Sequence, residues 1–176
     1  VAVVFFGDDN PGGKLPLIVP LNVRKCPEYD YYKPSAKRDY LGSTTEPLFP
    51  FGWGLSYSTF TYGKLKALPE TMAASGRAKI SVEVTNTSAV RGDEVVQMYV
   101  HQEVSSVTRA IKELRGFRRV TLNPGESGVV EFSVGVEELS FLNREMRRVV
   151  EPGVFTIMGG GNSSKLIETK LNVTSN

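Results

Sequence analysis

Between about residues 60 and 176 the chain is a succession of short segments in which apolar and polar residues alternate. In the segment 78–85, AKISVEVT, the apolar residues Ile80, Val82 and Val84 are separated by serine and glutamate. Successive side chains of a β-strand point to opposite faces of its sheet, so this period of two predicts a strand with one buried and one solvated face. A helix would show a period near 3.6 instead. The alternation is therefore the strongest constraint on the fold.

Further segments extend this pattern, and turn residues separate them. We predict strands at Glu94–His101, Lys112–Leu122, Gly128–Val134, Arg147–Val150, Val154–Met158 and Leu166–Val173. The breaks include NPGE at 123–126 and EPG at 151–153, where proline precedes glycine as in type I or II turns. About seven short strands with a turn roughly every ten residues predict a mainly β protein, an antiparallel β-sandwich of immunoglobulin or fibronectin type III-like kind.

The composition excludes several classes of protein. Of 176 residues, 21 are basic and 19 acidic, and a net charge of +2 does not favour nucleic acid or an anionic membrane as the partner. No apolar segment approaches the roughly 18 residues that a membrane-spanning helix needs. The single cysteine, Cys26, excludes an intramolecular disulfide framework and a cysteine-based zinc cluster. We assign Cys26 and the single histidine, His101, structural roles rather than those of a nucleophile and its base. We expect no metal and no cofactor.

Three short motifs have plainer explanations than the functions they suggest. The tripeptide Arg91-Gly92-Asp93 leads into a strand, and we interpret it as a turn rather than an adhesion motif. Glycines 159–161 lack the lysine and the following helix of a phosphate-binding loop, so they connect strands. The adjacent carboxylates at 8–9 and 137–138 do not form the facing pair that glycoside cleavage uses. The sequence therefore contains no catalytic constellation.

Residues 1–58 differ from the rest, since they hold most of the prolines and show no extended alternation. The chain begins VAVVFFGDDNPGG without an initiator methionine, which favours an internal segment of a longer polypeptide. The composition of residues 1–6 predicts a strand by propensity. Residues 1–58 are typical of the closing elements of a domain rather than of an independent one.

The segment 29–40, YDYYKPSAKRDY, combines tyrosines with basic residues. Tyrosine rings stack on sugars, and lysine and arginine donate hydrogen bonds to hydroxyl groups, so Tyr32, Lys33, Arg38 and Tyr40 are candidate substrate-binding residues. Tyrosines also cover domain interfaces, because the ring is apolar and the hydroxyl is polar. We favour the interface role and keep the substrate-binding role as the alternative.

The stretch PLFPFGWGLSYSTF, residues 47–60, contains five aromatic residues and no charge. Such a density would make an adhesive patch if it were exposed. The stretch lies where the proline-rich part ends and the alternation begins. We therefore predict an inter-domain seam in which most of the five rings are buried, namely Phe49, Phe51, Trp53, Tyr57 and Phe60.

Several motifs in a fixed order carry a resemblance to a known family. GDDNPGGKLPLIVP, YYKPSAKRDYL and PLFPFGWGLSYSTFTYGKL resemble the carboxy-terminal part of glycoside hydrolase family 3, which includes β-glucosidases and β-xylosidases. NTSAVRGDEVVQMYV, ELRGFRRVTLNPGES and EPGVFTIMGGGNSS are similar to the fibronectin type III-like domain that ends many members. The resemblance spans essentially the whole chain. It departs from the commonest pattern at Trp53, where tyrosine is frequent, and at Asp9, where an aromatic residue is frequent.

The resemblance implies a retaining, exo-acting enzyme with a (β/α)8-type domain, an α/β sandwich domain and the fibronectin-like domain. The nucleophilic aspartate and, in β-glucosidases, the acid/base glutamate would both lie upstream of Val1, and no residue of this chain matches either motif. Residues 1–58 would close the α/β sandwich domain and form the seam, and residues 59–176 would form the fibronectin type III-like domain. The implied partners are the upstream catalytic domains and a β-linked oligosaccharide or glycoside substrate.

The resemblance also implies that residues 1–6 form the end of a helix, with Gly7 directly after it. This differs from the strand that propensity predicts. A periplasmic or secreted parent enzyme is favoured over a cytoplasmic one. The alternative function is a non-catalytic module that binds carbohydrate or a cell surface through its β-sandwich. Phe117, Phe132 and Phe155 alternate with polar or small residues as core residues do, which disfavours that alternative.

Overall fold

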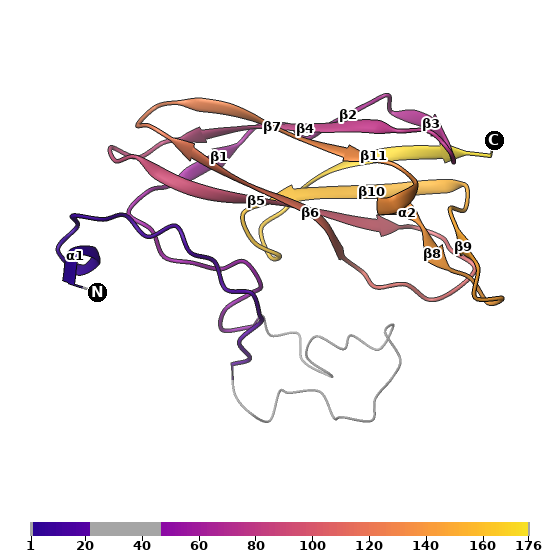
Figure 1. Ribbon diagram of the computed structural model, residues 1–176, viewed down its shortest axis with the longest axis horizontal. Helices are drawn as coiled ribbons and strands as arrows, with labels where there is room; N and C mark the ends of the chain where they lie inside the picture. Colours follow the sequence, from indigo (N-terminus) through magenta and orange to yellow (C-terminus); the bar gives the residue numbers. More distant parts are fainter. Residues whose placement is uncertain (1, 22–46, 176) are drawn as a thin grey trace.

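The computed structural model describes residues 2–21 and 47–175, and two facing β-sheets make up most of it (Figure 1). In chain order the elements are α1 (Ala2–Phe5), β1 (Phe60–Tyr62), β2 (Lys66–Leu68), β3 (Thr71–Ala73), β4 (Ala78–Asn86), β5 (Gly92–Gln102), β6 (Glu113–Leu122), β7 (Ser127–Val134), α2 (Val136–Leu139), β8 (Phe141–Leu142), β9 (Arg148–Val149), β10 (Gly153–Gly160) and β11 (Ile167–Thr174). The predicted mainly β sandwich is confirmed.

The two sheets have different sizes and a simple topology. In the four-stranded sheet, β4 pairs along its length with β7, and its other edge pairs with β1 and β2. The five-stranded sheet has the order β3-β11-β10-β5-β6. All these pairs are antiparallel except β3 with β11. The short strands β8 and β9 form a separate hairpin.

The alternation of the sequence becomes the alternation of burial. Along β4, Ile80, Val82 and Val84 are buried, and the residues between them face outward. The same holds for Val130, Phe132 and Val134 of β7. Side chains from both sheets meet in one hydrophobic core whose fully buried members include Val96, Val100, Leu139, Phe155, Ile157 and Leu171. Burial of these side chains is the main force that holds the sheets together.

The amino-terminal element is a helix, so the strand predicted from composition is wrong. One helical turn, α1, ends at Phe5, and Gly7, two residues later, has a φ of 83°, a left-handed conformation that favours glycine. The N–H of Gly7 donates to the carbonyl of Val4 at 3.2 Å, and that of Asp8 donates to Val3 at 2.9 Å. These two bonds form the usual glycine stop of a helix, and they outweigh the weak strand propensity of valine and phenylalanine.

Phe132 and Phe155 lie in the core as predicted, but the prediction for Phe117 is wrong, because its side chain is 67% exposed. The pairing of β5 with β6 is regular from Leu122 to Gly116, so Phe117 lies on the face opposite to the buried Leu122. Gly116 takes the core-facing position, and a Cβ there would lie 3.1 Å from the ring of Phe132. Since the ring of Phe132 fills that space, Phe117 points to the opposite face.

A pair of phenylalanine truncations tests this assignment. Phe155→Ala should lower the free energy of unfolding by about 3–5 kcal/mol, because it leaves a cavity between the sheets. Phe117→Ala should change it by no more than about 0.5 kcal/mol, since the ring is mostly in solvent. Urea unfolding followed by circular dichroism measures both, and equal losses would contradict the placement of these rings.

Candidate functional site

Two segments that precede the sandwich pair with each other and lie beside the five-stranded sheet; we call residues 8–19 and 47–58 the seam layer. The backbones of Val19 and Phe49 exchange hydrogen bonds of 2.9 and 3.2 Å in an antiparallel bridge. Further along, Leu15 donates to Trp53 at 2.8 Å and accepts from Gly52 at 2.9 Å. The seam layer lies below the sandwich in the view of Figure 1.

Backbone contacts fix the seam layer on the outer face of the five-stranded sheet. The N–H of Ser163, in the loop after β10, donates to the carbonyl of Phe51 at 2.9 Å. Gly52 lies directly on Gln97 of β5, and a Cβ at Gly52 would collide with that side chain. The φ of Gly52 is 81°, so both the space and the backbone conformation favour glycine here. The seam layer can approach the sheet this closely only because no side chain intervenes.

Asn10 ties the first part of the seam layer to the second and to the sandwich. Its carbonyl oxygen accepts from the N–H of Tyr57 and from the hydroxyl of Ser56, both at 2.9 Å. Its amide donates to the hydroxyl of Ser58 at 2.6 Å and to the carbonyl of Arg91 at 2.8 Å. The four bonds use both ends of the side-chain amide, so one residue fixes three segments relative to one another.

An ion pair joins the seam layer to the end of the core. The ammonium of Lys14 lies 2.9 Å from a carboxylate oxygen of Glu94 in β5, and these side chains are 20% and 8% exposed. The hydroxyl of Tyr62 lies against Glu94, and burial, followed by the charge of Glu94, raises the pKa of Tyr62 above its ordinary value. At Gly161 a Cβ would lie 2.8 Å from the Glu94 carboxylate. Three separate segments therefore converge on one buried carboxylate.

The Arg91-Gly92-Asp93 segment at the start of β5 is part of this framework. A Cβ at Gly92 would collide with the hydroxyl of Ser58. The carboxylate of Asp93 accepts from Thr121 at 2.6 Å and from Arg119 Nε at 2.9 Å. The hydrogen bond from Thr121, and then those from Arg119 and its charge, hold the pKa of Asp93 below its usual range. The tripeptide is engaged within the chain, but Gly92 and Asp93 are the first residues of β5, so the predicted turn ends before them.

The five predicted seam rings are less buried than we expected. Phe49, Phe51, Trp53 and Phe60 are partly buried, and Tyr57 is 50% exposed, so the prediction that most of these rings are buried is wrong for this chain. The physical reason is that the seam layer is a single layer of backbone that contacts the sheet on one side only, so its other side leaves the rings partly exposed. The rings of Phe49 and Trp53 contact each other with their centroids 4.3 Å apart, and Phe60 packs against the core.

The four candidate substrate-binding residues Tyr32, Lys33, Arg38 and Tyr40 lie outside the described residues. Three residues that bind the seam layer to the sandwich, Asn10, Lys14 and Glu94, were not singled out by sequence. The sequence did contain a sign that Glu94 is unusual. It precedes Val96, Met98 and Val100 at the same spacing of two, so a charge stands where the alternation demands an apolar residue.

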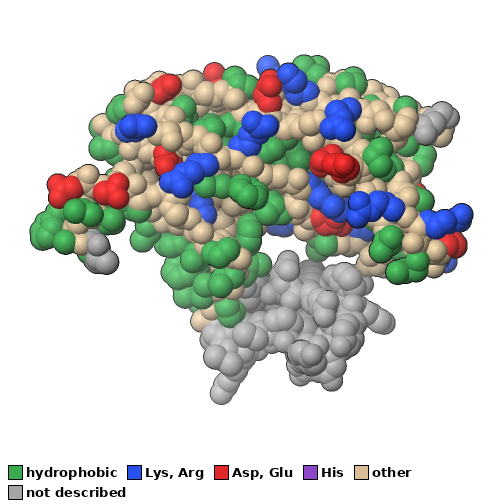
Figure 2. Space-filling model, in the orientation of Figure 1, with side chains coloured by type: hydrophobic (Ala, Val, Ile, Leu, Met, Phe, Trp, Pro, Cys, Tyr) green, Lys and Arg blue, Asp and Glu red, His purple; other side chains and the backbone are tan. Residues whose placement is uncertain are grey.

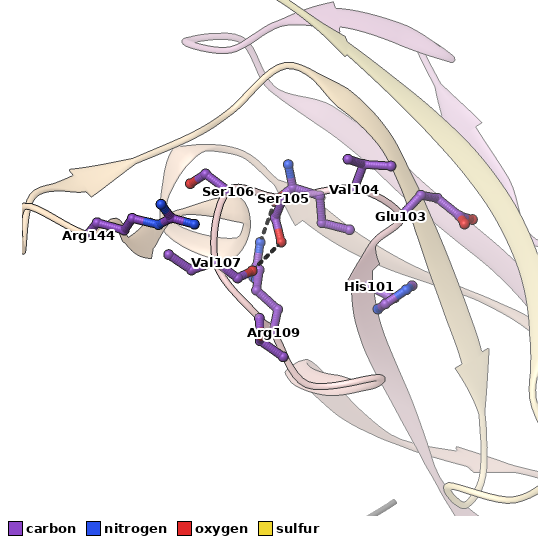
Figure 3. Close-up of a pocket in the computed structure, with 10 residues that line it drawn as sticks. His101, Glu103, Val104, Ser105, Ser106, Val107, Arg109 and Arg144 are labelled. Atoms are coloured by element: carbon purple, nitrogen blue, oxygen red, sulfur yellow. Dashed lines mark hydrogen bonds between the residues drawn. The ribbon is translucent and has the colours of Figure 1, made fainter. Parts of the chain in front are cut away.

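Apart from the seam layer, the surface has a hollow at the far end of β5, with His101 at one side and Arg144 at the other (Figure 3). Its volume is about 640 Å³, and the loop 103–109 forms most of its wall. Its other charged groups have partners: Glu103 accepts from Thr156 and lies 3.5 Å from Lys170. No aromatic ring for sugar stacking and no facing pair of free carboxylates lies among the lining residues that the structure describes.

Arg109 supports this wall and is only 5% exposed. It donates to both carboxylate oxygens of Glu113 at 3.2 and 3.1 Å and to the side-chain carbonyl of Gln102 at 2.9 Å. Its guanidinium also lies 4.9 Å from the ring centroid of Phe141. Arg115 donates to Glu113 from the other side. These groups stabilise the loop, and the arrangement fits a structural role rather than catalysis.

Among residues 2–21 and 47–175, no cluster of histidine, cysteine, aspartate and glutamate has the spacing of a metal site. No helix in the same part of the chain is long and apolar enough to cross a membrane.

Comparison with known proteins gives a consistent result. Residues 94–163 match the fibronectin type III-like domain. The chain is 51% identical to a β-xylosidase of Formosa agariphila over 93% of its length and 39% identical to a periplasmic β-glucosidase of Salmonella typhimurium over 94%. In each case it covers 23% of the relative, so the chain spans about a quarter of these proteins.

Solved structures agree with these relatives. A β-glucosidase of Erythrobacter marinus superimposes with a TM-score of 0.89 at 42% identity, over 98% of this chain and 23% of that one. A family 3 β-glucosidase (GH3) of Bifidobacterium adolescentis gives a TM-score of 0.84 at 28% identity, over 98% of this chain and 27% of that one.

Removal of the cation from the buried ion pair should destabilise the fold. Lys14→Met should lower the free energy of unfolding by about 3 kcal/mol, since it leaves the carboxylate of Glu94 buried without a cation. The double variant Lys14→Met, Glu94→Gln should recover part of this loss. Lys79→Met is the matched control: its pair with Glu131 is 60% and 49% exposed, so about 1 kcal/mol or less is expected. A loss at Lys14 no larger than at Lys79 in urea unfolding would contradict the buried pair.

Stability in acid should depend on Glu113. Burial raises the pKa of this carboxyl, but the hydrogen bond and charge of Arg109 and the charge of Arg115 lower it by more, so the pKa lies below its usual range. The ionised carboxylate therefore stabilises the fold above the pKa of the unfolded chain, and this contribution is lost as the pH falls through the folded pKa. Glu113→Gln should lower the melting temperature at pH 7, and its difference from the unaltered chain should shrink below about pH 4. Thermal unfolding between pH 7 and pH 3 tests this, and a difference independent of pH would contradict it.

Proposed function

Since the chain belongs to glycoside hydrolase family 3 and matches its carboxy-terminal part, including the fibronectin type III-like domain, we propose that it is the carboxy-terminal portion of a retaining, exo-acting β-glycosidase. The parent enzyme would remove terminal non-reducing β-D-glycosyl residues. This chain would act as a scaffold, and the nucleophile and the acid/base would belong to the upstream domains.

The observation that carries the proposal is the apolar outer side of the seam layer. Its side chains Leu17, Ile18, Leu48 and Leu55 are 54%, 39%, 49% and 71% exposed. In Figure 2 hydrophobic side chains, drawn in green, gather on a projection below the sandwich. A contiguous apolar surface of this kind marks an interaction site. The upstream part of the same polypeptide is the partner that best accounts for it.

The helix α1 supports the same partner. None of its residues is buried, and Phe5 and Phe6 at its end are 79% and 85% exposed. A single helical turn is not stable in water without packing. It is joined to the seam layer by backbone hydrogen bonds from Asp8 and Asp9 to Val3 and by a bond of 2.7 Å from the Tyr57 hydroxyl to the carbonyl of Val4. We propose that the upstream α/β sandwich domain covers these rings, and that residues 1–58 belong to that domain.

The contribution of this chain to catalysis would be positional. Retaining glycosidases need two carboxylates about 5–5.5 Å apart, and both would lie on the upstream domains. A displacement of about 1 Å in the groups that border a substrate can cost orders of magnitude in rate. The seam layer, fixed by Asn10 and Lys14, would hold those borders in place. Tyr32, Lys33, Arg38 and Tyr40 stay candidates for contact with the sugar.

The alternative, a non-catalytic carbohydrate-binding module, has less support. Among the described strands of the two large sheets, Phe117 is the one aromatic ring with a large exposed fraction. A platform for a polysaccharide chain needs several such rings in a row.

Activity measurements test the proposal. The chain alone should not hydrolyse aryl β-glucosides or aryl β-xylosides, and hydrolysis should require the upstream domains, either in the same polypeptide or added in trans. Activity of the chain alone would contradict the proposal. Binding of the chain alone to insoluble glucan, with an inactive full-length parent, would favour the binding module.

A further inference from the structure

The outer faces of the two large sheets differ in character. On the four-stranded sheet, Lys79 pairs with Glu131, and Ser133 accepts a hydrogen bond from Arg77. Its exposed apolar side chains, Leu68 and Val129, stand singly among polar residues. Single exposed apolar residues are normal on a solvated face. This sheet faces water.

The outer face of the five-stranded sheet is apolar and partly covered. Tyr99 of β5 and Met158 of β10 are paired across the sheet and are 4% and 5% exposed, yet neither belongs to the core between the sheets. They are therefore covered from outside. Next to Tyr99, Gln97 is 3% exposed beneath Gly52 of the seam layer. This face is already an interface over part of its area.

The same face continues, uncovered, onto the edge strand β6. Leu114 pairs with Tyr99 and Phe117 pairs with Gln97, so each lies on the outer face beside a covered residue. Phe117 is 67% exposed and Leu114 38%, and Ile111, just before β6, is 53% exposed. We call Ile111, Leu114 and Phe117 the Phe117 patch. Apolar surface that continues from a covered area into an exposed one indicates an interface that this chain fills only in part.

Two basic residues lie next to the Phe117 patch in sequence, and both have partners within the chain. Arg119 pairs with Val95 across β5 and β6 on the same face, and its guanidinium binds Asp93. Lys112 donates to the carbonyl of Ser163 at 2.7 Å. The exposed surface of the patch is therefore apolar at its centre, and a partner would contact it through apolar side chains.

We infer that the Phe117 patch is a docking surface for the upstream part of the same polypeptide, with Phe117 as its anchor. The patch continues the face on which the seam layer lies, and the seam layer is the strip of chain that leads to that upstream part. The inference rests on the proposed function, because it takes the upstream catalytic domains as the partner. A large aromatic ring at the centre of an interface commonly contributes most of its binding energy.

Limited proteolysis of the full-length parent enzyme tests the inference. Phe117→Asp should speed the cleavage that separates the sandwich from the upstream part by about tenfold or more, since loss of an anchor shifts the docked state by at least this factor. Val129→Asp is the matched control: it places the same charge at a residue 64% exposed on the opposite sheet, and cleavage should change less than about twofold. Equal cleavage rates of the two variants would overturn the inference.

Two further measurements make the outcome specific. If Phe117→Asp changes the sedimentation coefficient from dimer to monomer without faster cleavage, the patch binds a second copy and the inference is overturned. If the aspartate variant does not fold, Phe117→Ala against Val129→Ala decides by the same comparison of rates. Hydrolysis of aryl β-glycosides by the unaltered parent is measured separately. An inactive parent contradicts the proposed function, whereas an active parent with no effect at Phe117 contradicts only the docking surface.

Discussion

A carboxylate at the end of the sandwich core depends on a cation from outside the sandwich. Glu94 stands at a core-facing position of β5, where water cannot solvate it well, and Lys14 supplies the compensating charge from the seam layer. Desolvation of one charge costs several kcal/mol unless a partner is close. The buried negative charge of Glu94 is therefore compensated only when the seam layer is in place. Asn10, the Gly52 contact on Gln97 and the Arg91-Gly92-Asp93 segment all help to hold the layer where Lys14 can reach Glu94.

The strands could be predicted from the sequence because their cause is local. Alternation along β4 and β7 follows from side chains that point to opposite faces, and the predicted limits agree with the observed ones within one or two residues. The helix α1 could not be predicted from composition, since its end depends on two backbone hydrogen bonds around Gly7; the family resemblance implied it. Phe117 was misplaced because its apolar ring was taken as a sign of the core, although its position is out of step with Val120 and Leu122 of the same strand.

The candidate site was harder to predict because its contacts join distant parts of the chain. The aromatic stretch at 47–60 correctly drew attention to the seam, but the residues that fix it are a polar asparagine and an ion pair. The residues that flank Asn10 and Lys14 in the sequence are those of an ordinary loop, so nothing local marks either one. The exposure of the rings around Trp53 depends on what lies on the other side of the seam layer, which local sequence does not encode.

The bridge between Val19 and Phe49 has a consequence for how this family can vary in length. The bridge holds the two ends of the intervening segment side by side against the sandwich. The cost of closing a chain between fixed ends grows only logarithmically, by about 0.6 kcal/mol for each doubling of its length. Insertions or deletions between these two residues should therefore leave the register of the sandwich and the Lys14–Glu94 pair unchanged. The scaffold can therefore tolerate changes in the length of the chain between these two residues.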